Sequence, residues 1–432
     1  MLQTIKNAWK TPDLRRKILF ALFILLLYRI GAQIPIPFMK AELTSQMESM
    51  TTGILEYLNI LSGGAFAQAT LFALGISPYI TASIVIQLLA VAIPALERLS
   101  QDGEEGKKKL NQITRYVTVA LGLMTAVGYY FMLKNYDYLE NTGVFAAIVI
   151  IACYCAGSAL VMWLAEKINE NGIGNGISLI LFINIVSRGP TILQALIKYA
   201  KGEGVSAHWK GILIVVGSVL LFLIMTVLIV FINDSERRIP VQYAKKVVGR
   251  KMYGGQNSTL PIKLNNTGVM PIIFASSIVS LPATIGAFCN NGGDSKFWKG
   301  FFDLFSSSSW LYAALTLVLI IAFAYFYILI SFNPVEVSNN LKKQGGSIPG
   351  IRPGKPTSDY ITKILNRITL IGAIFLAFIA VVPMIINIAT GGLMNGLTFG
   401  GSSIIIVVGV AIETAREIEG QLTMRHYKGF LE

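Results

Sequence analysis

The stretch GILEYLNILSGGAFAQATLFALGISPYITASIVIQLL, residues 53–89, contains a short apolar segment followed directly by a long one. The short segment, residues 55–66, cannot cross a bilayer, which takes about 20 helical residues, and glycines precede and interrupt it. The long segment, residues 71–92, can span. Irregular backbone persists at membrane depth only where protein buries it or it lines a wet cavity. This order of segments therefore predicts a small helix seated in a cavity.

The composition is typical of a polytopic membrane protein. Of 432 residues, 54% are hydrophobic and 14% are charged, whereas soluble domains carry about 25% charged residues. The first span has no small-residue cleavage site and is expected to be retained. Hydropathy predicts ten spans, near residues 18–37, 71–92, 113–133, 143–165, 176–197, 211–233, 266–288, 309–330, 367–389 and 400–418.

The distribution of basic residues predicts the orientation. An even number of spans puts both termini on one side of the membrane. The loops on that side carry 27 lysines and arginines, and the opposite loops carry 8. By the positive-inside rule, both termini are expected in the cytoplasm. The net charge of +13 is therefore explained first by orientation.

Two cytoplasmic loops are long, at about residues 234–265 and 331–367. The first contains SERRIPVQYAKKVVGRKMYGGQNSTLPIKLN, whose partly alternating β-branched and basic residues predict a protruding β-hairpin. The second contains NPVEVSNNLKKQGGSIPGIRPGKPTSDY, whose glycines and prolines favour a stiff, shaped loop over a helix. Neither loop has room for a soluble catalytic domain.

Ten spans divide into two halves of five, residues 1–200 and 201–432, within one integrated membrane domain. Because each half has an odd number of spans, the second half is inverted relative to the first. Inverted repeats commonly build a membrane pathway at their interface. This expectation rests on topology, since the two halves share no clear residue-level repeat.

Residues suited to catalysis or ion coupling are scarce. The two histidines, His208 and His426, fall in an external loop and the tail, so neither suits a metal site or a Ser-His dyad within the membrane. No span carries a carboxylate near its centre, since Glu413 lies at a cytoplasmic end; this weakens an ion-coupled transporter. NGIGNG, residues 171–176, follows no strand and is expected to be a close-packed span entry rather than a dinucleotide-binding motif. We expect no enzyme, cofactor or metal.

Several long stretches resemble the SecY family of protein-conducting channels, in the family's order and across nearly the whole chain. They are SGGAFAQATLFALGISPYITASIVIQLL (62–89), NGIGNGISLI (171–180), ERRIPVQYAKKVVGRKMYGGQNSTLPIKLNNTGVMPIIFASS (236–277), FNPVEVSNNLKKQGGSIPGIRPGKPTSDY (332–360) and FGGSSIIIVVGVAIET (399–414).

The resemblance implies an all-α polytopic membrane fold, with ten transmembrane helices in two inverted five-helix halves around a central hourglass pore. It also implies a hydrophobic ring at the constriction, which would dewet and block ions when empty. The ring positions are Ile76, Ile80, Ile177, Leu181, Ile273 and Ile406. Leu181 departs from the all-isoleucine ring. Four-residue spacing puts each of the first two pairs on one helical face, which is equally typical of residues facing lipid or other helices.

A plug and a lateral gate are implied as well. The plug would be a short helix at about residues 53–68 that closes the pore from outside. Its apolar residues are Leu55, Leu58, Ile60, Leu61 and Phe66. The gate would open between the second and seventh spans, with Gln87 and Asn265 bonding across the seam. Either residue could instead make an ordinary interhelical hydrogen bond.

Partner sites are implied on the cytoplasmic loops. Arg250, Lys251 and Arg352 match positions that dock the SecA motor or the ribosome, whose RNA phosphates attract such cations; alternatively these cations only enforce topology. SecE and SecG would be companion subunits. The implied function is passage of unfolded secretory proteins across the bacterial plasma membrane, with signal sequences and membrane segments released sideways into lipid. The alternatives are a small-solute secondary transporter and, less favoured, an intramembrane hydrolase.

Overall fold

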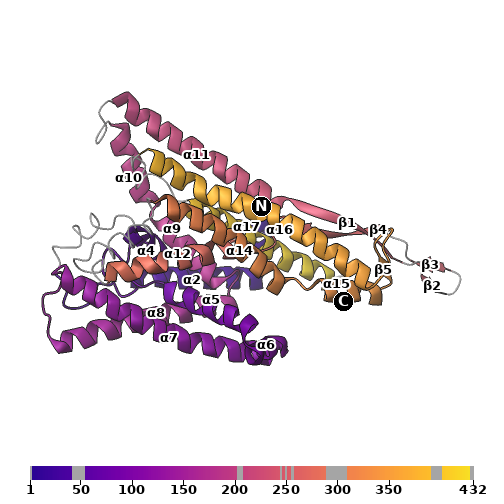
Figure 1. Ribbon diagram of the computed structural model, residues 1–432, viewed down its shortest axis with the longest axis horizontal. Coiled ribbons are helices and arrows are strands. Elements are labelled where there is room, and N and C mark those ends of the chain that lie inside the picture. Colours follow the sequence, from indigo (N-terminus) through magenta and orange to yellow (C-terminus); the bar gives the residue numbers. More distant parts are fainter. Residues whose placement is uncertain are drawn as a thin grey trace.

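The helices run mostly along the long axis of the molecule, and the strands lie at one end (Figure 1). The structure is a computed structural model that describes residues 2–40, 54–201, 208–243, 246–248, 251–253, 257–288, 309–390 and 401–428.

In the described part of the first half, helices overlap each predicted span, and three short helices, at residues 2–10, 54–61 and 94–101, lie outside the spans. In chain order the helices are α1 (Leu2–Lys10), α2 (Pro12–Gly31), α4 (Ile54–Leu61), α5 (Ser77–Ala92), α6 (Pro94–Gln101), α7 (Gly103–Asn135), α8 (Val144–Asn171), α9 (Gly176–Ser187) and α10 (Gly189–Ala200).

The second half contains helices and the described strands. They are α11 (His208–Asp234), β1 (Glu236–Tyr243), β2 (Lys246–Val248), β3 (Lys251–Tyr253), β4 (Asn257–Lys263), α12 (Met270–Phe288), α14 (Trp310–Ser331), α15 (Pro334–Lys343), β5 (Gly346–Ser347), α16 (Lys355–Ala389) and α17 (Gly401–Lys428).

The multi-pass membrane character is confirmed. Within the described residues, six helical segments are long and apolar enough to cross a membrane, and the bent pair α5–α6 makes a seventh. The remaining three predicted spans coincide with α2, α12 and α17, so the structure is consistent with ten. The bend between α5 and α6 is 107°. It falls at Pro94, which lacks a backbone N–H and disfavours helix at the residue before it.

Two predicted boundaries are wrong. The second span was expected from residue 71, but α5 begins at Ser77 because Gly75 adopts a left-handed φ of +54° and Pro78 occupies the first helical turn. The second cytoplasmic loop contains helix α15, whose first amides are capped by the Asn333 side chain at 3.1 and 3.3 Å. Helix α16 also begins at Lys355, inside the predicted loop.

The predicted hairpin is confirmed, and it packs on the second loop. Strands β1 and β4 pair antiparallel from Glu236 opposite Lys263, and β5 adds to the other edge of β1. Alternate residues of β1, Ile239 and Val241, are buried against Ile348 and Ile361. This period of two is expected of a half-buried strand.

The main core joins helices from both predicted halves. Helix α12 contacts α4, α5 and α7, and α17 contacts α9. The division at residue 200 stays a prediction. The glycine-rich entry to α9 is close-packed, because a Cβ on Gly176 would meet the backbone of Ala165 on α8.

Candidate functional site

The predicted ring residues meet in one apolar cluster. They come from four helices: α5 with the turn before it, α9, α12 and α17. Ile76, Ile80, Leu181, Ile273 and Ile406 are each 4% exposed or less, and Ile177 packs against them. The structure thus brings all six together. Residues this buried also serve as ordinary core, so their pore role stays a prediction.

The predicted plug lies against that cluster, but its helix is shorter than expected. Helix α4 ends at Leu61, and Phe66 lies in the turns that follow. Ile60 and Leu61 pack on the ring cluster, whereas Leu58 and Phe66 pack on a second cluster with α7 and α8. The plug therefore bridges two apolar clusters. The side chain of Leu55 lies outside the described residues.

Polar side chains from three spans bond the backbone that follows the plug helix. Tyr129 on α7 donates to the Phe66 carbonyl at 2.6 Å. Arg29 on α2 donates to the Gly63 carbonyl at 3.3 Å, and Asn184 on α9 donates to the Leu61 carbonyl at 2.6 Å. The sequence patterns singled out neither Tyr129 nor Asn184. The available signal was a lone asparagine inside the apolar run ISLILFINIVS.

A cavity of about 180 Å³ lies between the plug, α5, α7 and α12, at the predicted gate seam. Its walls are mostly apolar, with a row of hydroxyls on α12 at Ser277, Ser280 and Thr284. Ser280 and Thr284 donate to carbonyls of α12 itself, at 2.9 and 2.8 Å. The hydroxyls of Ser280 and Thr284 are therefore satisfied without a partner across the seam.

The predicted gate pair does not bond across the seam. Gln87 donates to Ser83 Oγ, one turn earlier on α5, at 3.0 Å. Asn265 lies between β4 and α12 and donates to Asn233 Oδ1 at the end of α11, at 2.8 Å. The expected cross-seam hydrogen bonds are wrong for this structure, because each amide has a nearer partner on its own side. A gate role for either residue stays a prediction.

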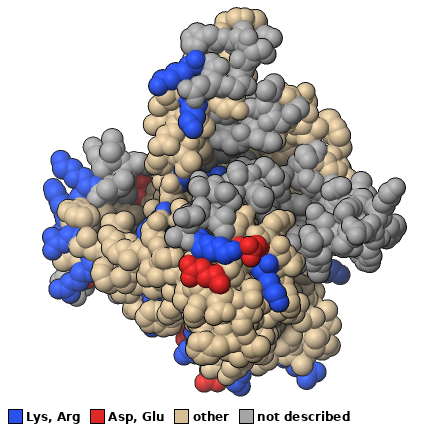
Figure 2. Space-filling model, turned by 90° about the vertical axis from the view of Figure 1, so that its left-hand side faces the viewer, with Lys and Arg blue, Asp and Glu red and all other residues tan. Residues whose placement is uncertain are grey.

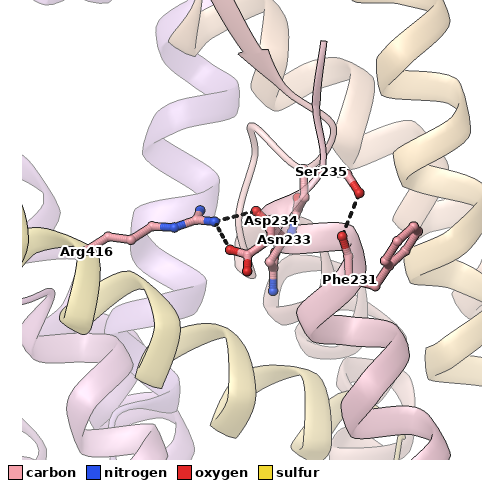
Figure 3. A network of polar contacts seen from close by, with 6 residues as sticks. Phe231, Asn233, Asp234, Ser235 and Arg416 are labelled. Carbon is pink, nitrogen blue, oxygen red and sulfur yellow. Dashed lines mark hydrogen bonds and ion pairs between the residues drawn. The ribbon is translucent and has the colours of Figure 1, made fainter. Parts of the chain in front are cut away.

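Arg416 on α17 ties down the root of the hairpin (Figure 3). Its Nη2 lies 2.6 Å from both the Asn233 carbonyl oxygen and Asp234 Oδ1. One residue later, the Ser235 carbonyl accepts from Leu264 N at 2.8 Å, which closes the base of the β1–β4 pair. The guanidinium therefore joins α17 to the point where α11 becomes β1.

Of the three predicted docking residues, the structure describes the side chain of Arg352 alone. Arg250 lies outside the described residues, and of Lys251 only the backbone, in β3, is described. Arg352 is exposed in the turn between β5 and α16, where Gly350 and Gly354 both have positive φ. Its carbonyl accepts from Thr357 Oγ1 at 2.9 Å. This bond braces the backbone of the turn and leaves the guanidinium exposed.

Figure 2 shows the end of the molecule opposite the hairpin. In this view most described atoms are neither basic nor acidic. The orientation of the termini stays a prediction.

Comparisons with known proteins converge on one family. The SecY family model matches residues 70–415. The protein translocase subunit SecY of Streptomyces galbus is 43% identical over 446 residues, covering 100% of both chains. A SecY structure described for a plug domain that stabilises the closed state of its translocation channel has a TM-score of 0.68 at 18% identity, covering 94% of this chain and 91% of that one. A Sec61 structure from a canine ribosome–channel complex has a TM-score of 0.60 at 16% identity, with the same coverage. The matches do not favour a small-solute transporter.

Proposed function

Because the chain belongs to the SecY family of protein translocase subunits, we propose that it forms the pore through which unfolded secretory proteins cross the bacterial plasma membrane. It is a transport component, not an enzyme, and both termini lie in the cytoplasm. One observation carries this proposal: ring residues from four helices, two in each predicted half, converge in one apolar cluster under the plug.

The ring acts by excluding water. A constriction of bulky aliphatic side chains dewets, so ions cannot cross it when it is empty. The same side chains offer a passing chain no hydrogen bonds, so any sequence can slide through. Helix α4 adds a second barrier and has to leave its place before a polypeptide passes.

Membrane segments leave sideways between α5 and α12. The cavity at this seam is lined mainly by apolar side chains, which suit an apolar signal helix. The hydroxyls of Ser280 and Thr284 already bond carbonyls of their own helix. Opening the seam therefore breaks no hydrogen bond of these two side chains, and separation of the helices costs mainly packing contacts.

Partners bind at the cytoplasmic loops. Arg352 offers an exposed guanidinium on a braced turn, and an arginine fork suits a phosphate or a carboxylate. Arg250 and Lys251, on the other long cytoplasmic loop, contribute further cations. A ribosome partner follows from the similarity to Sec61 in a ribosome–channel complex. SecA, SecE and SecG are the expected bacterial partners.

Affinity purification of the chain from its own cells tests this function. We expect SecE and SecG to co-purify in mild detergent, and SecA or ribosomes to associate in a salt-dependent manner. Recovery of the intact chain alone, after cross-linking in the native membrane, would contradict the proposal.

A further inference from the structure

Asn184 lies within the apolar helix α9 and is 0% exposed. A buried amide has to find hydrogen-bond partners, because an unsatisfied one is costly. Its Nδ2 donates to the Leu61 carbonyl at 2.6 Å and contacts the Tyr28 hydroxyl at 2.8 Å. These partners are 123 and 156 residues away in the chain. One amide therefore joins α9 to the plug and to α2.

The Leu61 carbonyl is a natural acceptor because it ends the plug helix. The last carbonyls of a helix lack intrahelical partners. In the described turn after α4, backbone amides bond the carbonyls of Leu58, Asn59 and Ile60 but not that of Leu61. A carbonyl accepts only, so the amide nitrogen of Asn184 has to face it. The orientation of the side chain is thus fixed by its partner.

The fit between Asn184 and the plug is tight. Gly63 has φ +66°, and a Cβ there would lie 2.8 Å from Asn184 Oδ1 and 3.0 Å from Asn184 Cα. The Oδ1 atom is buried without a hydrogen-bond partner in the described structure. With its oxygen unpaired, the buried amide of Asn184 is stabilised only by the two hydrogen bonds that its nitrogen donates. One of those contacts is lost whenever the plug leaves.

We propose that Asn184 is a positioning residue that latches the plug in its closed place through the Leu61 carbonyl. This inference rests on the proposed plug role of residues 53–68. The contact with Tyr28 joins α9 to α2 and persists when the plug moves, whereas the Leu61 contact exists only in the closed arrangement. Removing the amide therefore shifts the population toward the open plug.

Resting ion conductance in planar bilayers tests the latch. Asn184→Leu keeps the size of the side chain and removes its donors, and we expect resting conductance to rise about three- to thirtyfold, the range for one hydrogen bond in a membrane helix. Tyr28→Phe retains the plug contact and should raise conductance less. Ser178→Ala is the matched control, because it removes a buried hydroxyl without a partner from the same helix. It should leave conductance unchanged.

Deletion of residues 55–66 separates a latch from a general structural role. The deletion should raise resting conductance, and Asn184→Leu should then add nothing, since its target is gone. If the deletion leaks but Asn184→Leu alone has normal conductance, the latch is overturned and the plug role stands. An additive effect of the two changes would also overturn the latch. Unchanged conductance on deletion would contradict the plug role, and the latch with it. Comparable abundance of all variants in the membrane is required throughout.

Discussion

Arg416 and Asp234 form an ion pair of 2.6 Å that joins α17 to the last residue of α11. The same guanidinium nitrogen bonds the Asn233 carbonyl, and Asn233 in turn accepts from Asn265 beyond β4. Both ends of the β1–β4 hairpin therefore meet at Asn233, whose carbonyl Arg416 binds. The hairpin carries proposed partner sites. A partner bound there can position or pull on the membrane helices only if the base of the hairpin is fixed to them.

Arg416→Gln should loosen the hairpin root and reduce SecA-driven import of a secretory precursor into vesicles several-fold. Asp234→Asn should do less, because the Asp234 side chain is 66% exposed and exposed ion pairs contribute only about 0–1 kcal/mol. The Asn233 carbonyl remains bonded in that variant. Equal losses in the two variants would show that the ion pair, rather than the carbonyl contact, fixes the hairpin.

Gly63→Ala should unseat the plug turn. The φ of +66° disfavours any side chain by about 1–2 kcal/mol, and the added methyl group would also press on Asn184 and Arg29. We expect higher resting conductance. Gly64→Ala is the matched control, since its φ of +93° is strained but nothing lies within 4 Å of the new methyl group. A larger leak in Gly64→Ala would mean that strain alone, and not the contact with Asn184, controls the turn.

Arg352→Glu should abolish SecA-driven import while leaving insertion, abundance and SecE binding intact. The side chain is exposed and the Thr357 hydroxyl braces the turn through the Arg352 carbonyl, so charge reversal acts on the partner and not on folding. Arg352→Lys should be intermediate, because it keeps the charge and loses the planar fork. Lys343→Glu, an exposed charge reversal at the end of α15, is the control. Normal import by Arg352→Glu would contradict a docking role and leave Arg352 only as a cation that helps to orient its loop.

Sequence patterns located the helices well, because long apolar runs have few alternative structures in a membrane. They failed where a local signal opposed the general one. Glycine and proline suggested loop throughout residues 331–367, yet Asn333 and Pro334 form a helix start. Contacts distant in sequence were out of reach: Ser347 and Gln242, and Asn184 and Leu61, are 105 and 123 residues apart. The two gate predictions failed differently: Asn265 bonds Asn233, 32 residues earlier in the chain, whereas Gln87 bonds Ser83 one turn away on its own helix.

Resting conductance of the Ile80→Ser, Ile406→Ser double variant is the most direct test of a hydrophobic seal. The two residues lie on α5 and α17, in opposite predicted halves, and are 3% and 4% exposed. Hydroxyls at both positions should hydrate the constriction. We predict steady ion leakage with import of secretory precursors partly kept. Ile224→Ser is the control and should not leak, because Ile224 on α11 is 48% exposed. Unchanged resting conductance in the double variant, at normal abundance, would contradict the account that these residues seal a pore.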